Sequence, residues 1–139
     1  MGDAPHWKLK YAENKNGKPN HQKGQEIGHA FDNWIEWPIE EKTVLSQRII
    51  LKEDLTKGDV LFLEPTPTFT PNIQRYSKDS WDFYWRKKDD DTYYAHAFLN
   101  KGKTGPYFKI YIEEDLLAGE IYQNPRKESE DMITRGETK

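Results

Sequence analysis

Residues 81–112 decide the fold of this chain, in three segments: Trp81-Asp-Phe-Tyr-Trp-Arg-Lys-Lys88, Thr92-Tyr-Tyr-Ala-His-Ala-Phe-Leu99 and Tyr107-Phe-Lys-Ile-Tyr-Ile112. Each segment is rich in aromatic and β-branched residues, which is typical of β-strands. Asp89–Asp91 and Asn100–Pro106 separate the segments as turns, and the second turn holds two glycines that tolerate a positive φ. The stretch therefore predicts a three-stranded antiparallel meander.

Further strands are expected on both sides of this meander. Residues 44–52 and 59–64 are apolar runs bounded by turn residues, and Pro65, Pro67 and Pro71 then predict an extended loop. Trp7, Leu9 and Tyr11 alternate with lysines and predict an edge strand, while Ile121 and Tyr122 can close the sheet.

Two segments leave the choice between helix and another structure open. Residues 27–37 carry apolar side chains at the spacing of one helix face and end at Pro38, although Gly28 and the run Trp-Ile-Glu-Trp favour a strand almost equally. Glu113–Gly119 is expected to form a short helix or a turn, with acidic residues at the end that suits a helix dipole.

The fold class predicted from these elements is mainly β. We expect an antiparallel curled sheet of five to six strands or a small OB-like or SH3-like barrel, with one or two short helices. A flatter α+β sheet is the alternative. The predicted organisation is a flexible basic N-terminal arm (1–24), one globular domain (25–123) and a flexible C-terminal tail (124–139).

The bulk composition excludes several classes of protein. The chain has 139 residues, which predicts one domain, and it has no cysteine, which excludes disulfides and thiolate chemistry. A net charge of −3 argues against a histone-like binder of duplex DNA, but lysines and arginines gather in residues 1–24 and 70–112. No signal peptide and no run of about 20 apolar residues is evident, so a cytoplasmic protein is expected.

The motifs that suggest chemistry are weak. Gly102-Lys-Thr104 resembles the end of a phosphate-binding loop but lacks the earlier glycine, and Asp89-Asp-Asp91 lacks the spacing of a calcium loop. The four histidines show no metal-binding spacing. Asp32 followed by Glu40-Glu-Lys42 only faintly matches a nuclease pattern. The sequence therefore predicts a non-enzyme with no cofactor and no metal.

The alternation of side chains sorts the meander into two faces. Trp81, Phe83 and Trp85 share one face of the first strand. Ala95, Ala97 and Leu99 are expected inside the second strand, which would also turn Tyr93 inward, and Phe108, Ile110 and Ile112 inside the third. The residues predicted to bind a ligand from the outer face and its ends are Tyr84, Arg86, Lys88, Tyr94, His96, Phe98, Lys101, Lys103, Tyr107, Lys109 and Tyr111.

Rings flanked by cations match what single-stranded DNA or RNA requires, because bases stack on rings while lysine and arginine meet phosphates. The sequence thus predicts a non-catalytic binding module for single-stranded nucleic acid. The alternative is a small protein-interaction factor that regulates a larger machine, since aromatic and arginine residues also anchor protein interfaces. A sugar-binding surface is a third, weaker hypothesis. An ordinary structural use of the rings, beneath a second layer that includes Trp34 and Trp37, stays open as well.

Overall fold

The computed structural model describes residues 4–17, 21–37, 42–71, 82–88, 90, 92–103 and 105–125; for strand residues 34–37, 42–45 and 82 it describes the backbone only. Eight strands account for most of these residues. They are β1 (Trp7–Asn14), β2 (Glu26–Trp37), β3 (Lys42–Leu51), β4 (Asp59–Pro65), β5 (Asp82–Arg86), β6 (Ala95–Gly102), β7 (Gly105–Ile112) and β8 (Gly119–Pro125).

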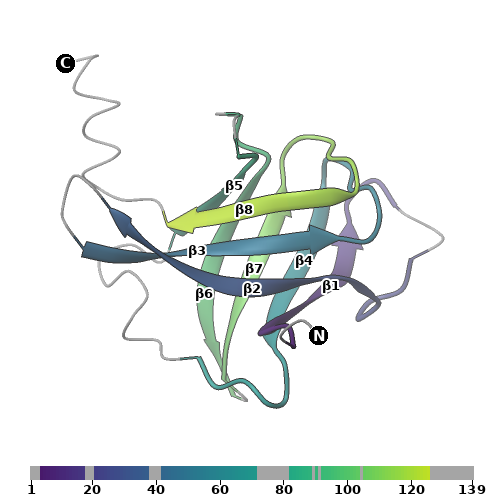
Figure 1. Ribbon diagram of the computed structural model, residues 1–139. Helices are drawn as coiled ribbons and strands as arrows, with labels where there is room; N and C mark the ends of the chain where they lie inside the picture. The colour runs from purple at the N-terminus through teal and green to yellow at the C-terminus, as the bar shows by residue number, and fades with distance from the viewer. Residues whose placement is uncertain are drawn as a thin grey trace.

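The strands close into one barrel in the order β1-β2-β3-β8-β5-β6-β7-β4, with β4 returning to β1 (Figure 1). Every neighbouring pair is antiparallel. The order differs from the chain order at two places: β8 lies between β3 and β5, and β4 lies between β7 and β1. The predicted class, mainly β with a small barrel, is confirmed.

The structure corrects the details of that prediction. There are eight strands rather than five or six, and the described residues contain no helix, so none there is long and apolar enough to cross a membrane. Residues 27–37 belong to β2, and residues 113–118 form a connection that holds a single bridge, Leu55 to Leu116. The flatter α+β alternative is not what the structure shows.

The boundaries of the barrel also differ from the predicted domain limits. Residues 7–14, expected in a flexible arm, form β1 between β2 and β4, so β1 is not an edge strand. At the other end β8 continues to Pro125. The rest of the predicted tail, residues 126–139, lies outside the described residues.

The core fills the barrel interior with the alternate side chains of each strand. In β5 and β6 large and small residues face one another: Phe83 is paired with Ala97 and Trp85 with Ala95, and all four are fully buried. Small side chains opposite large ones let a narrow barrel fill without voids. Phe108 packs edge-on against both Phe83 and Trp7.

A chain of polar groups crosses this core. Trp85 Nε1 donates to Gln123 Oε1 at 2.9 Å, Gln123 Nε2 donates to Gln47 Oε1, and Gln47 Nε2 donates to Asp32 Oδ1 at 3.1 Å. Trp7 Nε1 completes the chain by donating to the same Asp32 oxygen at 2.7 Å. Because each donor in this chain has an acceptor, two glutamines and two indole nitrogens are buried without the usual desolvation penalty.

Candidate nucleic-acid interface

The outer surface of β4, β7, β6 and β5 carries rings in two rows set by the strand register. One row runs from Lys10 in β1 through Phe62, Lys109 and Phe98, so that a cation alternates with a ring across neighbouring strands. The other row runs through Tyr111, His96 and Tyr84. Neighbouring strands lie roughly 4.8 Å apart, so these side chains form one continuous surface.

We call this surface the ring face. Its members are Lys10, Phe62, Tyr93, His96, Phe98, Tyr107, Lys109 and Tyr111; Tyr84 lies beneath Tyr93.

Ring contacts join the members of the ring face. His96 and Phe98 lie nearly parallel with centroids 5.9 Å apart, and Phe98 meets Tyr111 edge-on at 6.1 Å. Lys109 Nζ lies 5.5 Å from the centre of the Tyr111 ring. Phe62 and Tyr107 meet edge-on at 5.7 Å near the β6–β7 hairpin. Phe98 is 42% exposed, so a planar ligand can reach its ring from outside.

Two tyrosines depart from the predicted arrangement. Tyr84 faces outward as expected but is only 5% exposed, because the ring of Tyr93 stacks on it at 4.4 Å with 12° between the planes. Tyr93, predicted to point inward, is 39% exposed. The alternation fails there because β6 begins at Ala95, so Tyr93 and Tyr94 belong to the preceding connection.

Tyr94 is held by its own connection rather than by the ring face. Its hydroxyl donates to Asp90 Oδ2 at 2.7 Å, and Lys87 Nζ lies 5.2 Å from its ring centre. This hydrogen bond and one from the Thr92 backbone lower the pKa of Asp90 to about 2, and the same partnership raises the pKa of Tyr94. These contacts hold the Tyr94 ring beside Lys87.

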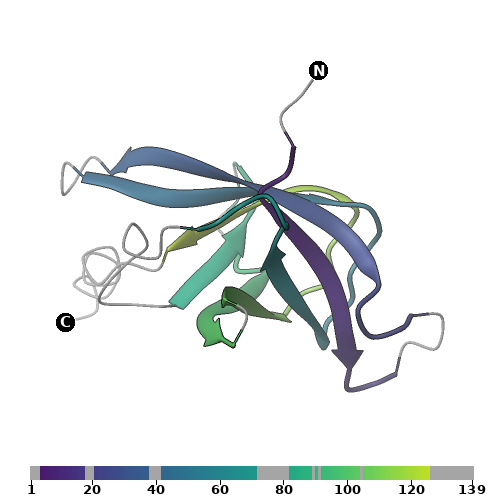
Figure 2. The same ribbon diagram turned by 90° about the horizontal axis from the view of Figure 1, so that it is seen from below.

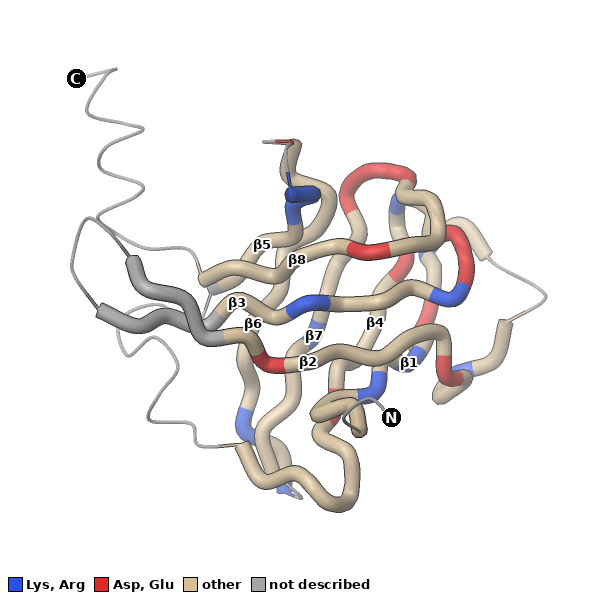
Figure 3. The backbone as a smooth tube through the Cα atoms, viewed as in Figure 1, with Lys and Arg blue, Asp and Glu red and all other residues tan. Residues whose placement is uncertain are grey.

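Four of the five predicted lysines and arginines lie at the two ends of this wall of the barrel (Figure 3). Arg86 and Lys88 are at the end of β5, where the Arg86 guanidinium donates to the backbone carbonyls of Lys87 and Lys88. Lys101 and Lys103 are exposed at the β6–β7 hairpin, and Lys109 lies between the ends. The structure thus brings His96, Phe98, Lys109 and Tyr111 together and leaves the other cations as flanking charges.

The electrostatics of the ring face are mixed. His96 Nδ1 and Glu113 Oε2 are 2.7 Å apart, and Lys10 Nζ forms an ion pair with Glu64 at 2.9 Å. The carboxylate of Glu64 therefore neutralises part of the cationic row, while Lys109 contacts a ring instead of an acid.

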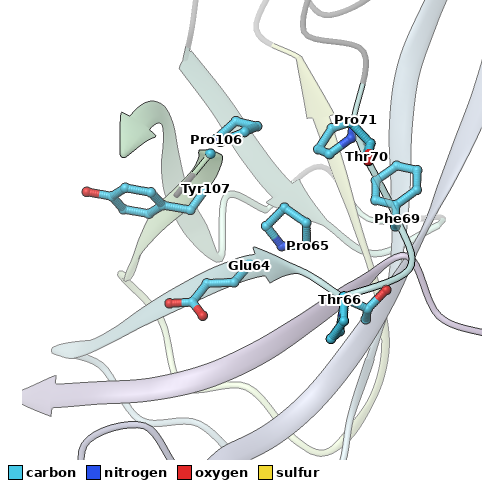
Figure 4. Close-up of a pocket in the computed structure, with 10 residues that line it drawn as sticks. Glu64, Pro65, Thr66, Phe69, Thr70, Pro71, Pro106 and Tyr107 are labelled. Atoms are coloured by element: carbon cyan, nitrogen blue, oxygen red, sulfur yellow. The ribbon is translucent and has the colours of Figure 1, made fainter. Parts of the chain in front are cut away.

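A groove of about 470 Å³ opens beside Tyr107, between the proline-rich loop after β4 and the start of β7 (Figure 4). Pro106 and Tyr107 lie on one side of it, and Phe69, Thr70 and Pro71 lie on the other. Its one carboxylate, Glu64, is the partner of Lys10. The groove continues the ring face from Tyr107 toward this loop.

The remaining predicted motifs do not assemble into a site among the described residues. The Asp32 carboxylate accepts hydrogen bonds from Trp7 and Gln47 inside the barrel; Glu40 and Glu41 lie outside the described residues, as do Asp89, Asp91 and Thr104. No cluster of three potential metal ligands occurs in the described part of the chain. The segment suggested as a second layer, residues 27–37, is instead strand β2, which pairs with β1 and β3; the side chains of Trp34 and Trp37 are not described.

Sequence reasoning missed Phe62, Lys10 and the exposure of Tyr93. The outward direction of Phe62 follows from its position between Leu61 and Leu63, both fully buried. Its place beside β7 depends on the pairing of strands far apart in the chain, which no local pattern shows.

Fold and surface together define a closed antiparallel β-barrel with a ring-rich, partly cationic outer wall. No protein-family model, no curated protein and no solved structure matches the chain.

Proposed function

We propose that this protein binds single-stranded DNA or RNA on the ring face without catalysing a reaction. The observation that carries the proposal is the row Lys10, Phe62, Lys109 and Phe98, in which cations and rings alternate across four strands. Bases have an aromatic surface whatever their sequence, so rings at regular intervals bind them, while the lysines meet the phosphates between them.

The direct test is fluorescence anisotropy with labelled oligo-dT and oligo-U of about ten nucleotides at about 50 mM salt. We expect micromolar or tighter binding. Phe98→Ala and Tyr111→Ala should each weaken it by about 5- to 150-fold, which corresponds to about 1–3 kcal/mol for one stacked base. Lys109→Gln should weaken binding and make it less dependent on salt, because one phosphate contact is lost.

A ring and a cation on another wall provide the matched control. Phe31 in β2 lies under the Arg48 guanidinium, 5.1 Å from its ring centre, and β2 is separated from β6 by three strands in either direction around the barrel. Phe31→Ala should leave oligonucleotide binding unchanged. Absence of binding by the folded wild-type protein to both oligonucleotides at low salt would refute the proposal and favour the protein-interaction hypothesis. Equal losses for Phe31→Ala and Phe98→Ala would refute the assignment to the ring face.

A further inference from the structure

A second groove, of about 540 Å³, lies where the ring face meets the β1–β2 turn. Tyr93 and Tyr111 of the ring face contribute to its lining, as do Lys15, Lys57, Glu113 and Glu114. A strand of nucleic acid that follows the ring face past Phe98 and Tyr111 therefore reaches this groove without leaving the surface.

The groove differs from the rest of the ring face in its two exposed carboxylates, because the third, Asp59, is buried and accepts from Asn14 Nδ2 and the Thr56 backbone. Lys15 and Lys57 come from the β1–β2 turn and from the loop before β4, whereas Glu113 and Glu114 directly follow β7. Phosphate groups favour the lysines and are repelled by the glutamates. A carboxylate has only acceptor oxygens, so within a DNA strand its suitable partners are the N–H groups of a base edge, to which RNA adds the ribose 2′-OH.

Glu113 is the glutamate whose position is fixed. Its Oε2 lies 2.7 Å from His96 Nδ1, and its side chain is still 48% exposed. The contact with His96 ties the carboxylate to the ring face, in the lining of the groove. A carboxylate oxygen can accept more than one hydrogen bond, so the contact with His96 leaves both oxygens able to accept from a ligand.

The bases differ in what they offer to such a group. Guanine presents two adjacent donors on its Watson–Crick edge, the ring N–H and the exocyclic amine, and these match the two oxygens of one carboxylate. Thymine and uracil present a single N–H between two carbonyl oxygens, and a carboxylate repels both oxygens. Adenine and cytosine present an amine beside an acceptor nitrogen, so each provides one favourable contact and one unfavourable contact.

We propose that this groove selects guanine in single-stranded nucleic acid, with Glu113 accepting hydrogen bonds from the guanine edge. Tyr111 supplies the stacking surface, and Lys15 and Lys57 meet the neighbouring phosphates. The inference rests on the proposed function, since the groove receives a base only if the strand lies on the ring face.

The test compares oligo-dT strands of about ten nucleotides in which one central position is thymine, guanine, hypoxanthine or adenine. Wild-type protein should bind the guanine strand most tightly. Hypoxanthine keeps the ring N–H but lacks the exocyclic amine, so its strand should bind at least about 5-fold more weakly than the guanine strand. The adenine and thymine strands should bind no better than the hypoxanthine strand.

Glu113→Gln tests the role of the carboxylate. The amide has one acceptor and one donor group, so this variant should bind guanine and hypoxanthine strands equally. Its affinity for plain oligo-dT should rise, because the charge that repels phosphates and thymine carbonyl oxygens is gone. Glu120→Gln is the matched control, because Glu120 in β8 pairs with Arg48 and does not line the groove. This control should keep the preference for guanine.

The outcomes separate the two proposals. Equal binding of all four strands, a preference for another base, or a guanine preference that survives Glu113→Gln would each overturn guanine selection while leaving single-strand binding intact. Failure of wild-type protein to bind any strand would refute both.

Discussion

The inner and outer surfaces of the β5–β6–β7 wall use the same kinds of side chain in opposite ways. Inside, Phe83 is fully buried and meets Phe108 edge-on at 5.0 Å. Outside, Phe98 on the neighbouring strand is 42% exposed and continues a row of rings. The comparison shows that an aromatic residue in a strand contributes to stability or to binding according to its face, which composition alone does not reveal.

The largest expected difference in stability is between two variants that each truncate one phenylalanine, on opposite faces of the wall. Phe83→Ala removes a fully buried ring and leaves a cavity, so it should lower the free energy of unfolding by about 3–5 kcal/mol. Phe98→Ala should lower it by less than about 1 kcal/mol, since most surface substitutions have small effects. Urea unfolding measures both. Equal losses of unfolding free energy in the two variants would show that Phe98 stabilises the fold as much as Phe83 does, and the two faces would then not differ in role.

The interior polar chain provides a test of intermediate size. Gln123→Leu removes the acceptor of the Trp85 indole and the donor to Gln47, and it leaves both groups buried without partners. We expect a net loss of about 1–3 kcal/mol in the free energy of unfolding, because the added apolar surface offsets only part of the penalty.

Gln22→Leu in the exposed β1–β2 turn is the control for Gln123→Leu and should have little effect. The double variant with Gln47→Leu and Gln123→Leu should lose less free energy of unfolding than the two single variants lose together, since the two glutamines share one hydrogen bond. Urea unfolding of all four variants measures this. A Gln123→Leu protein as stable as wild type would show that the chain contributes nothing to stability.

The smallest expected effect is a change in the pKa of Asp90, which lies at the margin of the ring face. Its pKa is about 2 because the Tyr94 hydroxyl and the Thr92 backbone donate to the carboxylate. Since the folded-state pKa lies below the ordinary value of 3.8, this contact stabilises the fold above that value and its contribution disappears as the pH falls through about 2.

Tyr94→Phe should move the Asp90 midpoint upward toward 3.8, measured by NMR titration of the carboxyl carbon. The control is Tyr122→Phe, which removes a hydroxyl that donates to Glu120 instead. It should leave the Asp90 midpoint unchanged. An Asp90 midpoint near 3.8 in the wild-type protein would contradict the Tyr94 contact.

The sequence predicted the local features of this wall well. The inward-facing positions of β5 and β7 follow from alternation, because Phe83 and Trp85, and then Phe108, Ile110 and Ile112, repeat with the period of a strand. Alternation also placed His96, Phe98, Lys109 and Tyr111 on the outside. These features depend only on neighbours along the chain, so one sequence is sufficient to find them.

The features that the sequence did not predict depend on long-range pairing. The insertion of β8 between β3 and β5, and of β4 between β7 and β1, determines both the strand count and the neighbours of the ring face. Gln47 and Gln123 have polar side chains that sequence patterns assign to the surface, and only the register of β3 with β8 brings them together inside. Tyr93 was misplaced because local patterns fix strand ends poorly.

Barrel closure has a consequence for how this protein can meet other chains. Where the ring of strands is complete, each backbone amide and carbonyl already has a neighbour, so an incoming peptide cannot join as an extra strand. The long β2–β3 hairpin is different: among the described residues its stretches 33–37 and 42–46 pair only with each other and extend away from the barrel (Figures 1 and 2). Among the described residues, both sides of this ribbon are therefore open to β-augmentation.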